Sequence, residues 1–576
     1  MRAPPGKRSP SRARGTALYL CHCGQNIAAT VDVEALAREF AEAQGIAVVR
    51  HYPYLCSRPG QELLRRDLRE GRADRVVVAA CSPRMHEATF RKAVAAEGLN
   101  PYLFGHVNIR EQCSWVHGDR EVATAKARDL VAMGLARVRR QEPLEGSRAP
   151  VVPRALVLGG GPAGLTAALD LAAMGVEVTL AEATDRLGGR ARAVGRSFPE
   201  GGEVGPWLAA RVRAVEENPP IEVLLESRLA GLAGAPGSFE AALDGPGGRL
   251  SRNAGAVIVA TGAALYRPDD PGEGRPELAY FEPGVITQEA LEARLRTAPG
   301  PVEVEGRPAE SVAFLQCVGS RDRTAGASHC SRVCCMVSVG QAAQVKERSP
   351  GARVQVLYMD LRAYARGAEE AYEEAARRGV LFRRGNPSEI YRKGGRLAVR
   401  FEDTLRGRAE ELDADLVVLA CGARPREDAA ELGRLLRIPR GPDGFYLEAH
   451  PKLRPVETAS DAVYLAGACQ GPKTIDEAVS SARAAAAKAA AALLRGFREV
   501  DPVVAEIDPA RCAGCGLCAE LCPAGAVARL SHLPVLAVET SQCKGCGACA
   551  AACPSKAASL RHYRCEQVLE EVERAG

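Results

Sequence analysis

A length of 576 residues predicts about three or four domains at roughly 150 residues each. With 46% hydrophobic and 26% charged residues, the composition indicates large cores, and a net charge of +5 is too small to indicate a nucleic-acid surface. Runs of about 18 apolar residues are absent, which argues against a membrane span. Twenty cysteines without a secretory signal favour metal or redox chemistry in the cytoplasm over a disulfide framework.

Residues 1–15 are rich in Arg, Pro and Ser and predict a disordered basic tail. A transit peptide is the alternative, but the prolines and glycines oppose the amphipathic helix that such a peptide forms. Residues 16–140 then alternate between strand-like and helix-like segments, which predicts an N-terminal α/β domain. The predicted strands of this domain are 17–21, 46–56, 75–81 and 101–107.

Five cysteines stand at or near the ends of these four strands, namely Cys21, Cys23, Cys56, Cys81 and Cys113. In a parallel α/β sheet such ends share one edge, where ligands usually bind. One interpretation is therefore a further cluster or metal site at this edge. The other is that these cysteines are small buried hydrophobic residues, which is common for free cysteine. The sequence leaves both open.

A glycine-rich motif opens the second α/β region, which runs from residue 154 to about 495. Residues 156–182 place GxGxxG between a strand and a helix, and an acidic residue ends the next strand, as a dinucleotide fold requires. A second loop, LGGR, and two later strand ends resemble those of two-domain flavoproteins, which favours FAD over NAD. The predicted FAD residues are Gly159, Gly161, Pro162, Ala163, Gly164, Glu182, Gly188, Gly189, Arg190, Ala260, Thr261, Gly262, Gly467 and Ala468.

A second nucleotide-like domain interrupts this flavin domain, but its first strand, 311–316, leads into cysteines instead of GxGxxG. Gly319 is one glycine where three are needed to seat a pyrophosphate, so the sequence predicts that the nicotinamide site is lost. Four thiols follow the strand, and they favour a [4Fe-4S] cluster over zinc or a redox-active disulfide. The predicted ligands are Cys317, Cys330, Cys334 and Cys335.

The C-terminal region contains an internal repeat, with CxxCxxCxxxCP at 512–523 and again at 543–554. This is the spacing of a bacterial two-cluster ferredoxin, in which the fourth cysteine of each repeat binds the other cluster. One predicted [4Fe-4S] cluster has the ligands Cys512, Cys515, Cys518 and Cys553, and the other has Cys543, Cys546, Cys549 and Cys522.

The predicted fold class is α/β, with a thioredoxin-reductase-like flavoprotein core between an N-terminal α/β domain and an α+β ferredoxin domain. The predicted domain bounds are 1–15 for the tail, 16–140 for the N-terminal domain, 151–299 and 416–497 for the two parts of the FAD domain, 300–415 for the insertion and 501–576 for the ferredoxin domain.

Several longer stretches resemble the A-subunits of the heterodisulfide reductase family, and the resemblance covers nearly all of residues 16–576. They are CHCGQNIA at 21–28, VVVAACSPRMHEATFR at 76–91, NIREQCSWVH at 108–117, CVGSRD and HCSRVCCM within 317–336, LYMDLRAYARGAEEAY at 357–372 and HPKLRPVETASDAVYLAGACQGPK at 450–473.

The cysteine motifs predict three [4Fe-4S] clusters, with a further N-terminal one left open. The resemblance implies FAD, a set of [4Fe-4S] clusters and electron transfer between partner subunits, in some members by flavin-based electron bifurcation. The implied partners are other subunits of a heterodisulfide-reductase-like complex that reduce a disulfide or sulfur compound, with ferredoxin or a hydrogenase or dehydrogenase as electron donor. A homodimer within a larger cytoplasmic complex is implied as well. The sequence indicates no catalytic acid, base or nucleophile for an organic substrate.

Two departures from the family pattern qualify this expectation. The sequence has no cysteine between Cys113 and Cys317, so the extra ferredoxin insert of some members is missing. Gly340 stands where a lysine beside the flavin is expected, and the missing cation argues against bifurcation. A self-sufficient NAD(P)H:ferredoxin oxidoreductase is the main alternative function, and a zinc-binding scaffold without redox activity is an alternative of another class.

Overall fold

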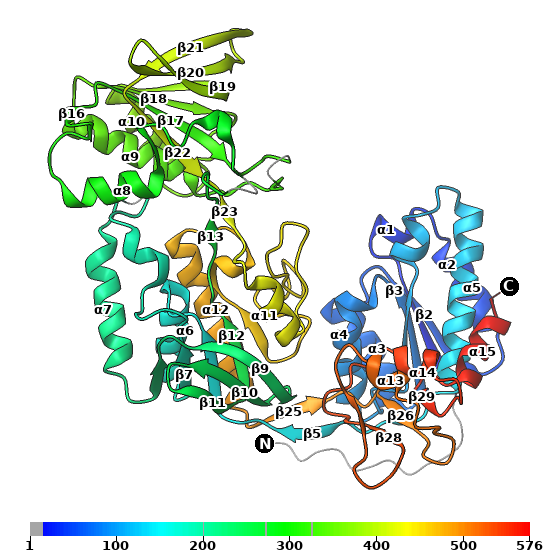
Figure 1. Cartoon of the computed structure of the whole chain (residues 1–576). Helices are drawn as coiled ribbons and strands as arrows, with labels where there is room; N and C mark the ends of the chain where they lie inside the picture. The colour runs from blue at the N-terminus through cyan, green and yellow to red at the C-terminus, as the bar shows by residue number, and fades with distance from the viewer. Residues whose placement is uncertain (1–14, 200, 271–273, 324–325, 576) are drawn as a thin grey trace. The chain divides into compact units, whose positions relative to one another are not determined.

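The computed structural model describes residues 15–199, 201–270, 274–323 and 326–575 (Figure 1). All of the predicted basic tail except Gly15 therefore lies outside the described residues. The chain divides into two compact units, one formed by the segments up to Arg148 and from Glu499 onward, the other by Ala149–Arg498. No helix in the described part of the chain has the length and apolar character to cross a membrane.

The first unit begins with a four-stranded parallel sheet in the order β2-β1-β3-β4. Both faces are buried, because Leu18 and Leu20 of β1 pack on one side and Ala17 and Tyr19 on the other. Such strands read as continuous apolar runs, which is why their sequences are easily identified. The strands are β1 (Thr16–Cys21), β2 (Ile46–Tyr52), β3 (Arg75–Ala80) and β4 (Phe104–Asn108). The helical segments are α1 (Gln25–Ala28), α2 (Val33–Ala41), α3 (Arg58–Arg69), α4 (Pro83–Ala96), η1 (Arg110–Ser114) and α5 (Arg120–Arg139).

The C-terminal segment of this unit consists of two small antiparallel strand pairs and short helices. Figure 1 shows α15 (red) beside α5, where Arg137 pairs with Glu571 at 3.2 Å and Arg140 with Glu570 at 2.8 Å. These ion pairs join the C-terminal segment to the N-terminal domain. The elements are β26 (Ala505–Ile507), α13 (Leu517–Glu520), β27 (Val527–Arg529), β28 (Leu536–Val538), α14 (Ala548–Ala552), β29 (Ala558–Leu560) and α15 (Cys565–Glu573).

The second unit contains a five-stranded parallel sheet in the order β24-β12-β6-β7-β8. Helices α6, α7 and α12 pack on one face of this sheet, and the β9–β11 layer with α11 packs on the other. Alanines of α12 allow this helix to lie close to α6. The strands are β6 (Arg154–Leu158), β7 (Glu177–Ala181), β8 (Ile221–Leu224), β9 (Arg228–Ala235), β10 (Ser238–Gly245), β11 (Gly248–Ala254), β12 (Ala256–Val259) and β24 (Val463–Leu465). The helices are α6 (Pro162–Ala173), α7 (Val204–Glu216), α11 (Ala429–Leu436) and α12 (Ile475–Leu493).

A seven-stranded sheet in the order β14-β22-β17-β18-β19-β20-β21 follows within the same unit. Figure 1 shows β19, β20 and β21 at one edge, where the pairing turns antiparallel. Because β14 and α8 belong to this sheet and its covering layer, the inserted domain uses residues before position 300. The strands are β14 (Val285–Thr287), β17 (Ser311–Val318), β18 (Arg353–Tyr358), β19 (Val380–Lys393), β20 (Arg396–Asp403), β21 (Arg408–Ala414) and β22 (Leu416–Cys421). The helices are α8 (Gln288–Thr297), α9 (Cys334–Arg348) and α10 (Ala368–Arg377).

The remaining described elements are short and connect these layers. The antiparallel pair of β13 and β23 joins the flavin domain to the inserted domain on both passes of the chain. The short elements are β5 (Ser147–Pro150), η2 (Gly189–Ala193), β13 (Ala264–Leu265), η3 (Pro276–Leu278), β15 (Glu303–Val304), β16 (Arg307–Pro308), β23 (Ala423–Arg424), η4 (Gly467–Gln470) and β25 (Phe497–Val500).

Candidate functional site

A cavity of about 780 Å³ opens at the carboxyl ends of β6, β7, β12 and β24 in the second unit. This edge of a parallel sheet is where dinucleotides bind. Gly164, Gly188 and Gly467 of the predicted FAD residues do not border the cavity. The predicted residues that do border it are Gly159, Gly161, Pro162, Ala163, Glu182, Gly189, Arg190, Ala260, Thr261, Gly262 and Ala468.

The glycines of the GxGxxG motif are required by close backbone approaches. A Cβ atom on Gly164 would stand 1.7 Å from the carbonyl oxygen of Gly159, so even the smallest side chain is excluded. A Cβ atom on Gly159 would stand 2.5 Å from the carbonyl oxygen of Ala260, and the φ of Gly159 is +106°. The loop therefore places α6 close to the sheet and points the first amides of this helix into the cavity. A pyrophosphate needs both features.

Glu182 ends β7 beside this loop and is held in a fixed orientation. Its Oε2 accepts a hydrogen bond from the Gly160 amide at 2.6 Å, and its Oε1 accepts from the Thr184 amide at 2.9 Å and hydroxyl at 2.8 Å. A carboxylate has about four acceptor positions, so one position is left for a hydroxyl of a ribose. The residues at this edge therefore fit the adenosine and pyrophosphate parts of FAD.

The sheet order indicates which end of the cavity takes the flavin ring. Glu182 ends β7 on one side of β6, whereas Ala260 follows β12 and Ala468 follows β24 on the other side. A dinucleotide with its ribose at Glu182 and its pyrophosphate at α6 is therefore expected to extend toward β24 and the start of α12. Cys334 of α9 borders the same cavity. The ring end is consequently where the flavin domain and the inserted domain meet.

The four thiols predicted for a cluster in the inserted domain lie close together. Burial raises the pKa of Cys317 to about 11, and the neighbouring Cys335 and Cys330 thiols add to this effect. A hydrogen bond from the Cys334 thiol lowers the pKa of Cys335 to about 7, and raises the pKa of Cys334. These thiols come from the end of β17, the following loop and the first turn of α9. A set of four thiolates at one place is the ligand set of a [4Fe-4S] cluster.

The backbone around these cysteines adopts conformations that side-chain-bearing residues rarely take. Cys317, Arg321 and Arg332 have φ values of 60°, 55° and 62°. Left-handed backbone at non-glycine residues costs free energy, of order 1–3 kcal/mol each, and is concentrated at functional sites. The Arg332 amide donates to the Cys330 sulfur at 3.3 Å, the kind of contact that tunes cluster potentials.

The position of a second pyrophosphate is closed by side chains. A Cβ atom on Gly319 would stand 2.1 Å from the ring of Tyr266, which is 3% exposed. The Ser320 hydroxyl donates to the His329 carbonyl at 2.9 Å, and the Ser331 hydroxyl contacts that of Ser320 at 3.0 Å, which folds the loop onto itself. The loop at the end of β17 therefore positions thiols and leaves no glycine-lined cradle for a nicotinamide dinucleotide within its described residues.

Gly340 lies on the buried face of α9, and an aromatic ring fills the space beside it. A Cβ atom on Gly340 would stand 2.1 Å from the ring of Phe198, which also borders the cavity. A lysine at this position would clash with Phe198. The packing of Phe198 against α9 therefore requires glycine at position 340, where the family pattern led us to expect lysine.

The ferredoxin-like segment brings its cysteines together in two groups that cross between the repeats. Burial raises the pKa of Cys518, and the Cys512, Cys515 and Cys553 thiols add to this effect. The second group is Cys549 with Cys543, Cys522 and Cys546, and the pKa of Cys549 is raised by burial and by these three thiols. A small cavity is bordered by all four thiols of this second group. The fourth cysteine of each repeat thus lies near the first three of the other, and the assignment of these cysteines as cluster ligands stays a prediction.

Glycines give each repeat its tight loop. Gly514 and Gly545 hold the same place in the two repeats and have φ values of 67° and 63°. A Cβ atom on either would stand 2.2 Å from the Pro534 carbonyl oxygen or 2.3 Å from that of Val503. Within the second of these loops the Gly545 amide donates to the Cys543 sulfur at 3.5 Å, and amides outside the two loops also donate to cysteine sulfurs. These other pairs are Ala526 with Cys522 at 3.2 Å, Ala558 with Cys553 at 3.4 Å and Ala505 with Cys543 at 3.4 Å.

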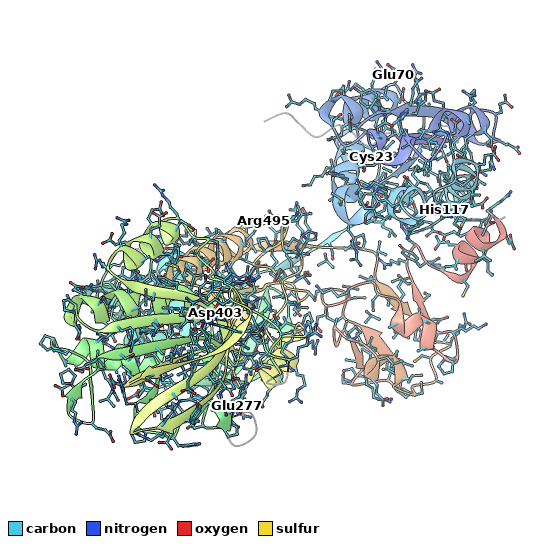
Figure 2. The ribbon with its side chains drawn as sticks, turned by 90° about the horizontal axis from the view of Figure 1, so that it is seen from above. Cys23, Glu70, His117, Glu277, Asp403 and Arg495 are labelled. Carbon is cyan, nitrogen blue, oxygen red and sulfur yellow. The ribbon has the colours of Figure 1, made fainter. Side chains whose placement is uncertain are left out.

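The five N-terminal cysteines do not form a single group. Burial raises the pKa of Cys21, with Cys23 and Cys56 adding to the effect, and it raises the pKa of Cys81 to about 11, with Cys23 and Cys21 adding. These four therefore gather at the carboxyl edge of the N-terminal sheet, and Figure 2 shows Cys23 within this domain. The Cys113 thiol instead donates to the Ala123 carbonyl at 3.0 Å in the core under α5.

No group of three or more His, Cys, Asp or Glu side chains in the described ranges is spaced to hold a single metal ion. A [4Fe-4S] cluster needs its ligands farther apart than a single ion does, because each of its four irons binds one thiolate.

The double substitution C56S/C81S decides between the two interpretations of the N-terminal thiols, because both side chains lie in the four-thiol group at the sheet edge. A loss of about four iron atoms per chain, the content of one [4Fe-4S] cluster, would add a cluster to the three proposed for the rest of the chain. Iron analysis of the purified protein checks this, and C113S is the matched control because Cys113 faces the core. Equal iron contents in C56S/C81S and C113S would show that the N-terminal thiols are small buried residues.

Cys421 and Lys473 are among the cavity residues that were not predicted from the sequence. Cys421 ends β22 and borders the cavity, but an isolated cysteine after a strand has no distinctive pattern. Lys473 borders it from the loop before α12. A sequence signal did exist for Lys473, because Thr474 and Glu477 form a capping box that marks the helix start directly after this lysine.

Comparison with known proteins agrees with this geometry. The profile of the pyridine nucleotide-disulphide oxidoreductases matches residues 153–488, and that of the 4Fe-4S dicluster domain matches residues 505–554. The second iron-sulfur A-subunit of the CoB--CoM heterodisulfide reductase of Methanopyrus kandleri is 40% identical over 88% of this chain and 90% of its own length. The A-subunit of the H(2):CoB-CoM heterodisulfide,ferredoxin reductase of Methanothermobacter marburgensis is 37% identical over the same shares of both chains. The iron-sulfur A-subunit of the CoB--CoM heterodisulfide reductase of Methanocaldococcus jannaschii is 36% identical over 96% of this chain and 97% of its own.

These matches confirm the fold class predicted from the sequence and the use of FAD and [4Fe-4S] clusters. The number of clusters stays a prediction. The protein is an oxidoreductase whose flavin and clusters transfer electrons. The chain belongs to the family of heterodisulfide reductase A-subunits.

Proposed function

We propose that this protein passes electrons between its FAD and three [4Fe-4S] clusters, and so connects an electron donor or ferredoxin with a partner that reduces a disulfide or sulfur compound. The observation that carries the proposal is the position of Cys334. This residue borders the flavin cavity and also belongs to the four-thiol group with Cys317, Cys330 and Cys335. A cluster held there would be the first acceptor for electrons leaving the flavin.

The chemistry of the two cofactor types explains why they are combined. A flavin exchanges electrons in pairs or singly, whereas each cluster carries one electron at a time. The chain supplies the cradle for the dinucleotide through Gly159, Gly161, Gly164 and Glu182, and thiol groups for the clusters. No hydride donor is needed, in keeping with the filled loop at Gly319.

The proposed partners are other subunits of a heterodisulfide-reductase-like complex and a ferredoxin or a hydrogenase or dehydrogenase as donor. The name of the Methanothermobacter relative includes ferredoxin, which supports this choice. A homodimer within a cytoplasmic complex belongs to the same proposal. The Phe198 ring beside Gly340 leaves no space for the cation expected there, so flavin-based bifurcation in this chain would need a cation at another position.

The purified holoprotein tests this function directly. We expect dithionite-reduced ferredoxin to bleach the flavin, while NADH and NADPH alone leave its absorbance unchanged over the same time, because the described loop at the second pyrophosphate position is closed. Dithionite alone serves as the control that the flavin is reducible. Rapid bleaching by either nicotinamide nucleotide would favour the self-sufficient NAD(P)H:ferredoxin oxidoreductase, and a protein with no flavin or iron–sulfur absorbance would favour a zinc scaffold.

A further inference from the structure

Lys473 lies at the end of the cavity where the flavin ring is expected. It stands in the loop between β24 and α12, and its neighbours Pro472, Thr474 and Ile475 also border the cavity. This loop is on the side of β6 opposite Glu182, which is the adenosine end. The ammonium of Lys473 is therefore placed where it would interact electrostatically with a charge on the flavin ring.

The ammonium of Lys473 has one neutral hydrogen-bond partner, and no salt bridge to it occurs among the described residues. It donates to Oε1 of Gln470 at 3.1 Å, and Gln470 is itself oriented by donating to Glu448 at 2.8 Å and to the Pro455 carbonyl at 2.9 Å. Burial lowers the pKa of Lys473, and the neighbouring Glu477 and Glu448 carboxylates act in the opposite direction.

Two of the other arginines that border the cavity, Arg190 and Arg426, are paired with carboxylates, whereas Arg192 and Arg196 border it in and after η2, on the chain segment that follows Glu182. Arg190 pairs with Glu289 at 3.1 Å, and Arg426 pairs with Asp428 at 2.9 Å. Because each of these arginines faces a fixed negative charge, its field at the ring is reduced. The hydrogen-bond partner of Lys473 is neutral, and the carboxylates of Glu477 and Glu448 act on its charge without a direct ion pair.

The N-terminus of α12 brings the positive end of a helix dipole to this place, and the Asp476 and Glu477 carboxylates in its first turn offset part of that field. Thr474 caps the helix, which is 19 residues long, and its hydroxyl accepts from the Glu477 amide at 3.2 Å. The first amides of a helix have no partner within the helix, and the helix dipole favours negative charge there. Lys473 precedes this N-terminus directly, so both features act on the same region of the cavity.

Arg332 holds this loop against the cluster thiols. Lying between Cys330 and Cys334 in the chain, it donates to the Pro472 carbonyl at 3.0 Å and to Oε1 of Glu477 at 2.6 Å. Lys473 lies between Pro472 and Glu477 in the chain, so Arg332 fixes the chain on both sides of this lysine. A fixed charge is effective because no reorganisation is required when the flavin is reduced.

We propose that Lys473 supplies the positive charge that stabilises the reduced flavin, in place of the cation that is absent at position 340. The inference rests on one part of the proposed function, namely that the flavin receives electrons from a partner. When the flavin takes up two electrons and one proton, its net charge becomes more negative by one. Lys473 is expected to stabilise that charge at the ring without exchanging a proton itself.

The substitution K473Q tests this inference in the holoprotein. We expect the two-electron equilibrium of the flavin to shift toward the oxidised form by at least about tenfold, which is about 30 mV for a two-electron couple. The measurement is a dithionite titration with redox mediators, followed at the flavin band, with FAD content determined for each variant. The control is K488Q in α12, the helix that follows Lys473, since Lys488 is exposed and lies 3.6 Å from Glu457, away from the cavity lining. K488Q should keep the wild-type equilibrium, and equal equilibria in K473Q and K488Q would overturn the proposal.

A second variant covers the case in which K473Q does not retain FAD. K473R keeps the charge and is expected to hold the flavin equilibrium within about threefold of the wild type. With FAD bound, a shift of tenfold or more in K473R would overturn the proposal. This titration uses no protein partner, so it is independent of electron exchange with ferredoxin. Failure of the proposed function would instead appear as a wild-type protein that does not react with reduced ferredoxin.

Discussion

The double substitution C334S/C335S is expected to remove about four iron atoms per chain and to block electron flow from the flavin to the ferredoxin-like clusters. Both thiols belong to the four-thiol group at the end of β17, and Cys334 also borders the flavin cavity. Serine keeps the size of the side chain but does not replace a thiolate well as an iron ligand. Iron content, FAD content and the rate of cluster reduction after flavin reduction are the measurements.

The control for this experiment is C421S, because Cys421 borders the same cavity but lies outside the thiol group. C421S should retain the iron content and electron transfer of the wild type. Loss of one zinc ion instead of iron in C334S/C335S would identify a zinc site. Unchanged metal content in both variants would show that the four thiols bind no metal, and the proposed route from the flavin would then be wrong.

The substitution G164A is expected to weaken FAD binding at least about hundredfold, which corresponds to about 2.7 kcal/mol. An alanine Cβ at this position would stand 1.7 Å from the Gly159 carbonyl oxygen, so α6 has to move away from the loop. That movement takes the helix N-terminus away from the pyrophosphate that it should bind. The Kd for FAD, measured by fluorescence titration of the flavin-depleted protein, reports the effect.

G205A is the matched control for G164A. Gly205 lies in α7 of the same domain, and a Cβ atom there meets no atom within 4 Å. Alanine is also a better helix former than glycine, so G205A should bind FAD normally and unfold at a slightly higher temperature. Wild-type FAD affinity in G164A would contradict the assignment of this loop to the pyrophosphate.

The two halves of the second unit show how a nucleotide-binding fold can serve two different cofactors. In the flavin domain, glycines leave a strand end open for a dinucleotide. In the inserted domain, the matching strand end is closed by Tyr266 over Gly319, and thiols occupy the loop and the first turn of α9. The fold of the two domains is similar, but the residues at these strand ends decide whether a pyrophosphate or a cluster is held.

The sequence alone determined the features whose residues lie close together in the chain. The GxGxxG loop and the CxxCxxCxxxCP repeats predict their ligands because each set is held by one tight turn and needs a fixed local spacing. The parallel sheets were predictable for a similar reason, since strands buried on both faces are continuous apolar runs. The grouping of Cys317 with Cys330, Cys334 and Cys335 followed from their short separation.

Tertiary structure decided the features that depend on which strands are neighbours and which helix covers them. The grouping of Cys21, Cys23, Cys56 and Cys81 requires the order β2-β1-β3-β4, and only packing under α5 separates Cys113 from them. Phe198 and Gly340 are in contact although they lie more than a hundred positions apart in the chain. Lys473 likewise borders a cavity whose other walls include residues more than a hundred positions before it. Such contacts leave no local pattern, because strand order and side-chain packing, not spacing along the chain, bring the residues together.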